Sequence, residues 1–386
     1  MDPALQQIVE RVRAAAADAA SSPSPRRLRI RGGGTKDFYG EPPEGEALST
    51  AALTGITNYE PSELFVTVRA GTPLAELETL LAGQGQCLPF EPPRYAPGAT
   101  VGGMVAAGLS GPSRASVGAV RDYVLGVTLV NGRGDVLTFG GQVMKNVAGY
   151  DVSRVLAGSL GVLGVIAEVS LKVLPVAPAE TTLRFDCNQA DALRLLNEWG
   201  GRPLPLNASC WVDDAGRAVL YLRLRGAVAA VEAACGHLGG DRLDEPQVAA
   251  DWDMCRDQTL PWFADRGSDE DLWRVSVPQT APVLGLDGAP LIEWHGGQRW
   301  YRAAPGQAAR VRAAARAAGG HATLFRAGAS LGVKPATDIA ADGVPRFDTL
   351  SAPLARIHDA LLREFDPHGL FDSARLHRRY PLPRAA

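Results

Sequence analysis

The chain has 386 residues, a length that predicts two domains rather than one core. Hydrophobic residues make up 46% and charged residues 21%, which is typical of a soluble globular protein and argues against general disorder. The 39 basic and 42 acidic residues give a net charge of −3, so bulk charge favours neither nucleic acid nor an anionic membrane as a partner. Any anionic ligand must therefore be bound by a local arrangement of residues.

The five cysteines are scattered and never spaced as C-x-x-C. This pattern argues against a disulfide framework, a zinc site or an iron–sulfur cluster held by this chain. The N-terminal stretch carries acids and arginines through its apolar positions, unlike a signal peptide. No run approaches the roughly 18 apolar residues of a membrane span. We therefore expect a cytoplasmic chain that has no bound metal and does not itself span a membrane.

Hydrophobic periodicity predicts the first elements in chain order. Apolar residues at helical spacing predict a helix over 4–20, which the sequence SSPSP ends. Alternating apolar residues predict a strand over 64–68. The leucines that follow predict a helix capped by Thr72-Pro73 and stopped at Gly83.

A hairpin and a linker follow in the sequence. Asn131-Gly132 predicts a tight turn between two β-branched runs. Alternation over 165–175 predicts a strand that ends at Pro175. The sequence PVAPAE after it is the predicted domain linker.

The second half alternates short strands with alanine-rich helices. The predicted elements are a strand over 181–186, a helix over 189–199, strands over 208–213 and 217–225, and a helix over 226–238. This β-α-β-β-α order is typical of a split antiparallel sheet. A hairpin at Gly296-Gly297, a helix over 306–318 and a strand over 321–326 come next. A last apolar stripe predicts a helix that stops before Asp366.

Three separate glycine groups lie in the first half of the chain. They are Gly32-Gly33-Gly34, then Gly98, Gly102, Gly103, Gly108 and Gly111, then Gly158, Gly161 and Gly164. Glycine permits positive φ and carries no Cβ, so consecutive N–H groups can converge on an anion such as a diphosphate. For any single group, tight turns and close strand packing explain the glycines equally well. Together they predict a large phosphate-bearing cofactor.

The first glycine group matches neither common nucleotide fingerprint. Lys36 follows Thr35, and the second glycine of a Walker A loop is missing. Asp37 stands where the last glycine of G-x-G-x-x-G would be. An enzyme of NAD or of a nucleoside phosphate is therefore disfavoured, and the residues alone do not identify the cofactor.

Three motifs carry a resemblance to a known family. RGGGTK at 31–36, PGATVGG at 97–103 and the stretch from MKNVAGYD to VSLKVLP resemble the FAD-binding domain of the vanillyl-alcohol oxidase and p-cresol methylhydroxylase superfamily. More narrowly, EPPRYAPGATVGGMVAAGLSGP, GGQVMKNVAGYD, LIEWHGGQRW and GGHATLF are similar to the E subunit of bacterial glycolate oxidase. The C-terminal FDPHGLFDSARL departs from the family's closing signature at Asp372, Ser373 and Ala374.

The resemblance implies an α+β fold in three parts. A two-part FAD-binding domain of the p-cresol methylhydroxylase type would span 1–178. An α+β cap domain with an antiparallel sheet on the substrate side would span 179–348. A C-terminal helix and tail over 349–386 would return to the FAD-binding domain.

The resemblance also assigns cofactor-binding residues. The pyrophosphate of FAD would be wrapped by Arg31, Gly32, Gly33, Gly34, Thr35 and Lys36. The phosphates and flavin would be lined by Pro97, Gly98, Thr100, Val101, Gly102, Gly103, Gly108 and Gly111. Gly161, Val165 and Ile166 would border the adenosine or flavin edges. Thr35 occupies the place of the histidine that tethers flavin in some superfamily members, so we expect noncovalent FAD.

Oxidation of a 2-hydroxy acid by flavin needs a cation for the carboxylate and a base for the hydroxyl proton. The candidates in the second half are His295, Arg299, Arg302, His321 and Arg326. The alternative is that these arginines are solvated strand-edge residues and that the histidine is a hydrogen-bonded structural residue. No segment similar to the metal-binding HxGDGNxH of related subunits is present.

The resemblance implies an FAD-binding subunit of a glycolate oxidase complex. Partners would be a second FAD-binding subunit and an iron–sulfur subunit, with electrons passing from the flavin to the latter. The complex would be cytoplasmic or peripheral to the membrane. The alternative is an FAD-holding electron-transfer or scaffolding subunit that has no substrate pocket of its own.

Overall fold

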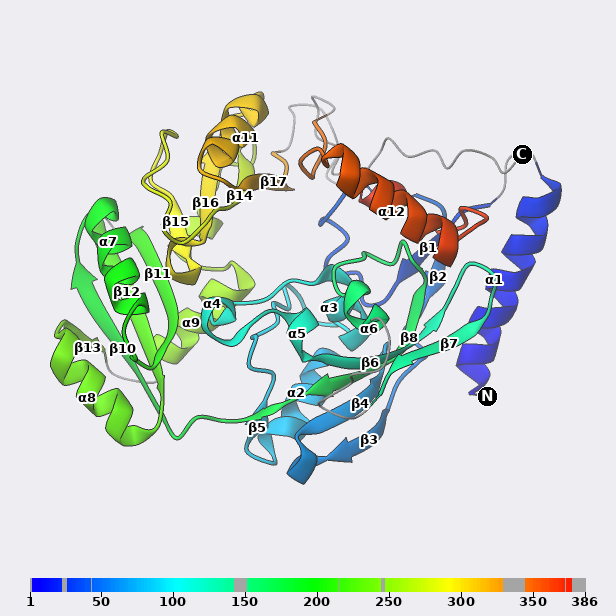
Figure 1. Ribbon diagram of the computed structural model, residues 1–386, viewed down its shortest axis with the longest axis horizontal. Helices are drawn as coiled ribbons and strands as arrows, with labels where there is room; N and C mark the ends of the chain where they lie inside the picture. The colour runs from blue at the N-terminus through cyan, green and yellow to red at the C-terminus, as the bar shows by residue number, and fades with distance from the viewer. Residues whose placement is uncertain are drawn as a thin grey trace.

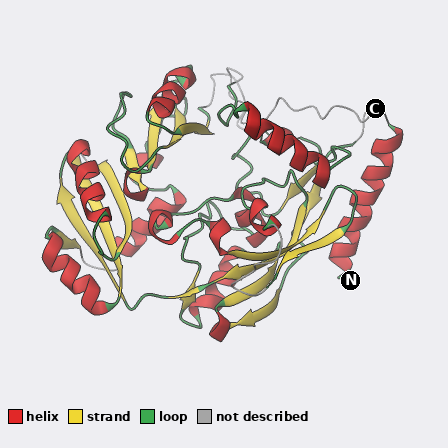
Figure 2. Cartoon of the chain, in the orientation of Figure 1, coloured by secondary structure: helices red, strands yellow, loops and turns green. Residues whose placement is uncertain are grey.

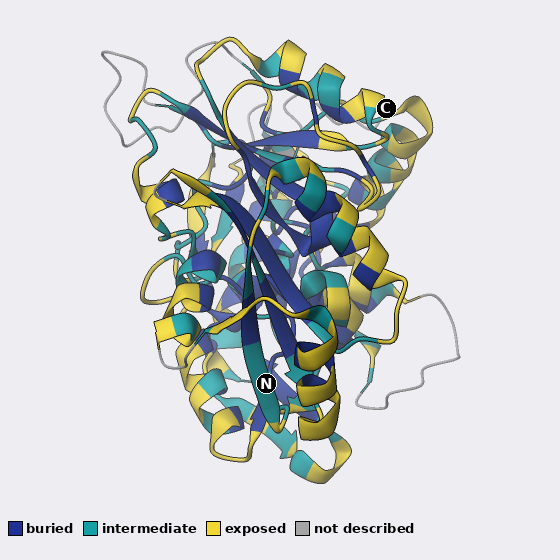
Figure 3. Ribbon diagram, turned by 90° about the vertical axis from the view of Figure 1, so that its left-hand side faces the viewer, coloured by how far each residue is buried: buried dark blue, intermediate teal, exposed yellow. Residues whose placement is uncertain are grey.

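The computed structural model describes residues 2–22, 26–42, 44–141, 151–214, 216–243, 247–328, 344–371 and 373–376. Two large sheets dominate the described chain, one of five strands and one of eight, with helices packed around them (Figures 1 and 2). Buried residues follow the strands, whereas exposed residues gather on the outer faces of helices and on loops (Figure 3). The expected α+β class with antiparallel sheets is confirmed.

The first helix is α1 (Pro3–Ser21), as the apolar spacing predicts. The Asp2 carboxylate accepts hydrogen bonds from the first backbone N–H groups and caps the helix. Its apolar face packs in one core with β1 (Leu28–Arg31) and β2 (Glu46–Ser49), which pair in parallel. Neither strand is predicted from the sequence, because four residues show too little alternation. The strand β1 ends where the triple-glycine run begins.

The five-stranded sheet is antiparallel throughout. Its spatial order is β3 (Ile56–Glu60), β4 (Phe65–Arg69), β8 (Val165–Lys172), β6 (Val124–Val130) and β7 (Val136–Gly140). The predicted turn between the last two strands is confirmed, because the Asn131 side-chain oxygen accepts hydrogen bonds from the N–H groups of Arg133 and Asp135. This local bonding holds the turn while β6 and β7 pair.

Two helices pack into the core of this sheet, α2 (Leu74–Ala82) and α3 (Val101–Ala107). The predicted leucine helix and its stop at Gly83 are confirmed, but its predicted cap is wrong. The Thr72 hydroxyl bonds to the backbone of Gly55 instead, accepting from its N–H at 2.9 Å. The start of α2 therefore has no side-chain cap.

The eight-stranded sheet lies in the second half of the chain. Its spatial order is β13 (Asp241–Leu243), β10 (Ala179–Asp186), β12 (Arg217–Gly226), β11 (Leu206–Asp214), β15 (Leu291–Glu293), β16 (Gln298–Ala303), β14 (Asp271–Ser276) and β17 (His321–Arg326). Pairing of Trp211 with Ile292 joins its two parts into one sheet. All neighbouring strands are antiparallel.

Helices pack against this sheet in the predicted order. They are α7 (Gln189–Gly200), α8 (Val228–Leu238) and α11 (Ala308–Ala317), and the predicted β-α-β-β-α run is confirmed. The hairpin between β15 and β16 is also confirmed, and its bend is the short helix η2 (Trp294–Gly296). The strand β14 and the helices α9 (Gln247–Asp257) and α10 (Pro261–Ala264) are not predicted from the sequence, which shows little periodicity there.

The two halves of the chain contact one another through aromatic side chains. Phe38 and Tyr39, which follow the triple-glycine run, each lie within 5.4 Å, ring centre to ring centre, of Phe325 on β17. The C-terminal helix α12 (Ala352–Phe365) returns to the first half, where Phe365 joins the core of the five-stranded sheet (Figure 1). The division into domains at 178 and 348 stays a prediction. No described helix is both long and apolar enough to span a bilayer.

Candidate functional site

The fold brings the three glycine groups together. A Cβ added at Gly33 would lie 1.6 Å from the carbonyl oxygen of Gly98. A Cβ at Gly108 would lie 2.7 Å from the Cα of Gly158. Gly161 faces a side chain of β1, the strand that precedes the triple-glycine run. Segments far apart in sequence therefore lie against each other, and the lack of Cβ at Gly33 first serves the packing of two backbone segments.

The triple-glycine loop has a backbone suited to a phosphate group. None of the N–H groups from Gly32 to Lys36 donates a hydrogen bond to another part of the described chain. Gly34 and Gly98 adopt positive φ of 72° and 89°. Consecutive N–H groups without partners bind anions well, because each adds a partial positive charge at short range. The loop therefore fits the diphosphate of a dinucleotide.

Lys36 adds a cation beside these N–H groups. Burial lowers its pKa to about 8, although Asp257 and Glu78 oppose the shift. Its ammonium lies 5.5 Å from the centre of the Tyr95 ring. Arg31 is paired with Asp37 at 2.7 Å. Lys36 is therefore the better placed of the two cations to balance a diphosphate.

Several predicted cofactor residues have a packing role. A Cβ at Gly102 would lie 2.5 Å from the Cβ of Ala70, and one at Gly111 would lie 2.3 Å from a backbone oxygen. The Thr100 hydroxyl caps α3 by accepting a hydrogen bond from Gly103. These residues fix α3 and the chain that follows it against the sheet.

Other predicted residues can face a ligand only through their backbone or lie at the surface. The side chains of Val101, Val165 and Ile166 are buried in the core. Pro97 and Gly98 are exposed. The GGQVMKNVAGYD motif lies almost wholly outside the described residues.

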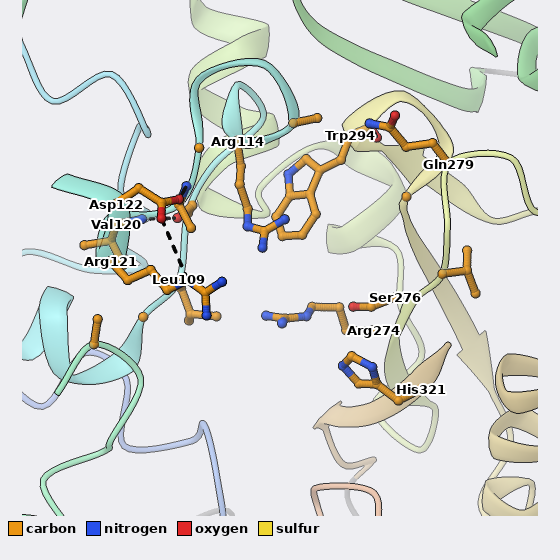
Figure 4. Close-up of a pocket in the computed structure, with 18 of the residues that line it drawn as sticks. Leu109, Arg114, Val120, Arg121, Asp122, Arg274, Ser276, Gln279, Trp294 and His321 are labelled. Carbon is orange, nitrogen blue, oxygen red and sulfur yellow. Dashed lines mark hydrogen bonds and ion pairs between the residues drawn. The ribbon is translucent and has the colours of Figure 1, made fainter. Parts of the chain in front are cut away.

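A cavity of about 650 Å³ lies between the two halves of the chain. On one side it is lined by α4 (Arg114–Val117), α5 (Val120–Tyr123) and the loop from Gly108, and on the other by β14, η2 and β17 (Figure 4). Its basic residues come from both sides: Arg114, Arg121, Arg274 and His321. The cavity therefore adjoins the glycine-rich segment and carries positive charge.

The cations of the cavity differ in their partners. The guanidinium of Arg114 lies 4.4 Å from the centre of the Trp294 ring. Arg121 lies 3.9 Å from Asp122. The Nε atom of Arg274 is buried and has no partner among the described residues. Burial, followed by repulsion from Arg274, lowers the pKa of His321, so its imidazole is neutral near pH 7.

Of the residues predicted for catalysis, His321 lines this cavity. Arg299 is fully buried and its three nitrogens donate to the carbonyl groups of Gly296, Ala281 and Pro282. His295 is bonded to the hydroxyl groups of two serines, and burial lowers its pKa to about 4. The geometry of these two residues indicates a structural role.

Two further predicted arginines stack on aromatic rings away from the cavity walls. The guanidinium of Arg326 lies 3.5 Å from the centre of the Phe38 ring, and that of Arg302 lies 5.0 Å from the centre of the Trp262 ring. Arg114 and Arg274 were not selected from the sequence, because their local sequence carries no distinctive pattern. Arg114 lies in a short helix after the glycine segment, and Arg274 lies on a strand that shows no clear alternation.

Metal binding gains no support from the described part of the chain, in which no group of three or more histidine, cysteine, aspartate or glutamate residues could hold a metal ion. The free N–H groups, the positive-φ glycines and Lys36 instead fit a noncovalently bound dinucleotide.

Comparison with known proteins gives the family of the chain. An FAD binding domain matches residues 6–140. Glycolate oxidase subunit GlcE of Escherichia coli (strain K12) is 42% identical over 96% of this chain and 97% of its own length. D-lactate dehydrogenase of Archaeoglobus fulgidus and glycolate oxidase subunit GlcD of Bacillus subtilis are 32% and 31% identical, over 46% and 40% of this chain. The chain spans 40% and 33% of the lengths of these two proteins.

Solved structures agree on the fold. An alkyldihydroxyacetonephosphate synthase superposes with a TM-score of 0.62, at 14% identity, over 96% of this chain and 74% of the other. At this identity the likeness concerns the fold, which is of the expected p-cresol methylhydroxylase type. Similarity along nearly the whole length of both chains decides the family: this FAD-binding oxidoreductase chain belongs to the family of glycolate oxidase subunit GlcE.

Proposed function

We propose that the chain is the FAD-binding subunit of a complex that oxidises glycolate or a similar 2-hydroxy acid to the 2-oxo acid. The observation that carries the proposal is the near full-length similarity to a glycolate oxidase subunit. The cationic cavity beside the glycine-rich segment supports it, because a 2-hydroxy acid is an anion that must meet the flavin.

Different residues of this chain would bind FAD, bind the substrate and accept its proton. The N–H groups of residues 32–36 and the ammonium of Lys36 would hold the diphosphate of FAD without a covalent bond. Bound FAD supplies the acceptor for the hydride of the α-carbon. Arg114 and Arg274 would hold the substrate carboxylate, and the neutral imidazole of His321 would accept the hydroxyl proton. Roles for Arg299 and His295 in the reaction have less support, since their polar atoms are bonded within the protein.

Electrons would leave through partner subunits. A second FAD-binding subunit and an iron–sulfur subunit complete the proposed complex, which would be cytoplasmic or peripheral to the membrane. The five cysteines of this chain are not spaced for a cluster, so an iron–sulfur centre would have to come from a partner.

A second candidate function is electron transfer or scaffolding by a subunit that holds FAD without oxidising substrate itself. The observation that favours it is that the sequence has no segment similar to the metal-binding HxGDGNxH of related subunits. Related subunits with the HxGDGNxH segment would then supply the substrate site.

Anaerobic mixing with glycolate distinguishes the two. The purified chain should show flavin absorption bands, and glycolate should bleach them if the chain oxidises substrate. Bleaching that requires added partner subunits would support the second candidate. Protein that binds no FAD after exposure to excess FAD would contradict both.

A further inference from the structure

The geometry points to a two-sided carboxylate site formed by Arg274 of β14 and Arg114 of α4. The two guanidinium groups enter the cavity from opposite halves of the chain, and together they would bind a small organic carboxylate (Figure 4). That the carboxylate belongs to the substrate rests on the proposed function. The binding of a carboxylate does not.

Arg274 lies on a strand that is paired on both sides, and it has no ionic partner among the described residues. The strand β14 pairs with β16 on one side and with β17 on the other, where Arg274 lies opposite Trp300 and Thr323. Its Nε is buried without a partner in the described chain, and no described carboxylate pairs with its guanidinium. Removing part of a guanidinium from water without a paired carboxylate costs folding free energy. An anion in the cavity would remove that cost.

Arg114 is fixed by stacking, which leaves its N–H groups available. Its guanidinium lies over the ring of Trp294, whose indole N–H donates to the carbonyl oxygen of Gly111 at 3.0 Å. Stacking uses the face of a guanidinium, whereas its donors point outward in the plane. Arg114 makes no hydrogen bond within the described chain that would occupy them. The N–H donors of Arg114 are therefore oriented before a ligand binds.

The charge of the cavity is not balanced by its own walls. Asp122 is the single carboxylate among the described lining residues. It accepts a hydrogen bond from the N–H of Ala119 at 2.8 Å and lies beside Arg121. Asp122 pairs with Arg121 and also acts on Arg114, so a single lining carboxylate faces three arginines. Burial, followed by the charges of Arg274 and Arg121, lowers the pKa of Arg114.

A carboxylate fits this arrangement better than a neutral ligand. One carboxylate has two oxygens, so it can accept hydrogen bonds from both guanidinium groups and reduce their repulsion. Because one arginine comes from each half of the chain, bound carboxylate would also link the β14 side of the cavity to the α4 side.

Oxalate is the probe for the test, since it has two carboxylates and no α-hydrogen to be oxidised. Its dissociation constant is measured by calorimetry on the FAD-loaded chain and on Arg274→Gln, Arg114→Gln and Arg121→Gln. Charge-assisted hydrogen bonds contribute about 1.5–3 kcal/mol each, so the first two variants should bind roughly 10- to 150-fold more weakly. Arg121→Gln is the matched control in the same cavity and should change binding by about threefold or less.

Two outcomes would overturn the site. One is wild-type protein that binds no oxalate at millimolar concentration. The other is Arg274→Gln that retains FAD and binds oxalate as wild type does. If that variant fails to fold, oxalate binding is measured on Arg274→Lys instead, because lysine keeps the charge but cannot form two parallel hydrogen bonds to a carboxylate. It should recover part of the affinity, and full affinity would contradict the proposed geometry.

The test separates this inference from the proposed function. In one outcome, oxalate binding depends on both arginines, but glycolate does not bleach the flavin even when partner subunits are added. That outcome supports the carboxylate site and refutes the proposed function. Bleaching by glycolate that is equally fast and equally concentration-dependent in Arg274→Gln keeps the function and refutes the site.

Discussion

Nη2 of Arg223 donates to both carboxylate oxygens of Glu91, at 2.6 and 2.7 Å, and this ion pair joins the two halves of the chain. The Arg223 side chain is 3% exposed. Burial alone would raise the pKa of Glu91, but Arg223 and Arg225 outweigh burial and hold that pKa below its usual value. The chain segment that carries Glu91 leads directly into the residues assigned to FAD, so the pair positions the eight-stranded sheet relative to that segment.

Glu91→Gln should lower the free energy of unfolding by about 3–5 kcal/mol, because it leaves Arg223 buried without its counter-charge. Chemical denaturation of purified protein measures the loss. The double variant Glu91→Gln with Arg223→Met should recover part of it, since no unpaired charge remains. A loss below about 1 kcal/mol in the single variant would show that the pair contributes little to stability.

Gly33→Ala should release bound FAD and lower the melting temperature of the FAD-free chain. The added Cβ would lie 1.6 Å from the carbonyl oxygen of Gly98, so the two segments must move apart, at about 1–3 kcal/mol. Flavin absorbance after gel filtration and thermal unfolding measure the two effects.

The control for this change is Gly236→Ala in α8. Its Cβ would meet nothing within 4 Å, and alanine favours a helix by about 1 kcal/mol over glycine. This variant should keep its FAD and be slightly stabilised. Stoichiometric FAD together with an unchanged melting temperature in Gly33→Ala would contradict the close contact of the two glycine segments.

The affinity for FAD should fall as the pH rises above about 8. Burial lowers the pKa of Lys36 to about 8, and a bound diphosphate would raise that pKa because it favours the ammonium form. Between the two pKa values, binding requires uptake of a proton, and affinity drops by up to tenfold for each pH unit.

Lys36→Met tests the assignment. Titration of the FAD-free chain with FAD from pH 7 to 9 should show weaker binding by this variant at pH 7 and a flatter dependence on pH than wild type. If the affinity for FAD depends on pH equally in both proteins, the assignment of Lys36 to the diphosphate site is wrong.

Acid should weaken the fold through His295. Its ring contacts Ser209 of β11 and Ser116 of α4, and burial lowers its pKa to about 4. The unfolded chain takes up this proton near pH 6.5 and the folded chain near pH 4. The free energy of unfolding therefore falls by up to about 3 kcal/mol as the pH decreases through that window.

The contribution of His295 is the difference between wild type and His295→Gln in chemical denaturation at pH 7 and pH 4.5. Wild type should lose more stability than the variant, because glutamine does not titrate. A difference between the two proteins that is the same at both pH values would show that the histidine does not titrate in this window.

Local sequence patterns predicted most of the regular structure. The apolar stripe of α1, the turn at Asn131 and the alternation of β8 each follow from residues that are neighbours in sequence. Thr72 shows the limit of such patterns. Its hydroxyl is a suitable helix cap by sequence, but Gly55, 17 residues earlier, takes its hydrogen bonds in the folded chain.

The candidate site was predicted in part. The glycine groups were found because runs of glycine can be read directly from the sequence, and His321 was chosen because a histidine can act as the base for the hydroxyl proton. Arg299 was chosen for its residue type, yet it is fully buried against backbone carbonyl groups. Arg274 was missed, because nothing in its local sequence distinguishes a guanidinium that lacks a partner from one that has a partner.

From the sequence, motifs that resemble a known family indicated the family and the cofactor, and periodicity and glycine runs predicted most of the helices and strands, because all of these are local properties of the chain. Tertiary structure decided which glycines pack on each other, which arginines are bonded and which face the cavity. Charge balance in a cavity depends on side chains from both halves of the chain, such as Arg114 and Arg274, which 160 positions separate in the sequence. Only folding brings those charges to the same place.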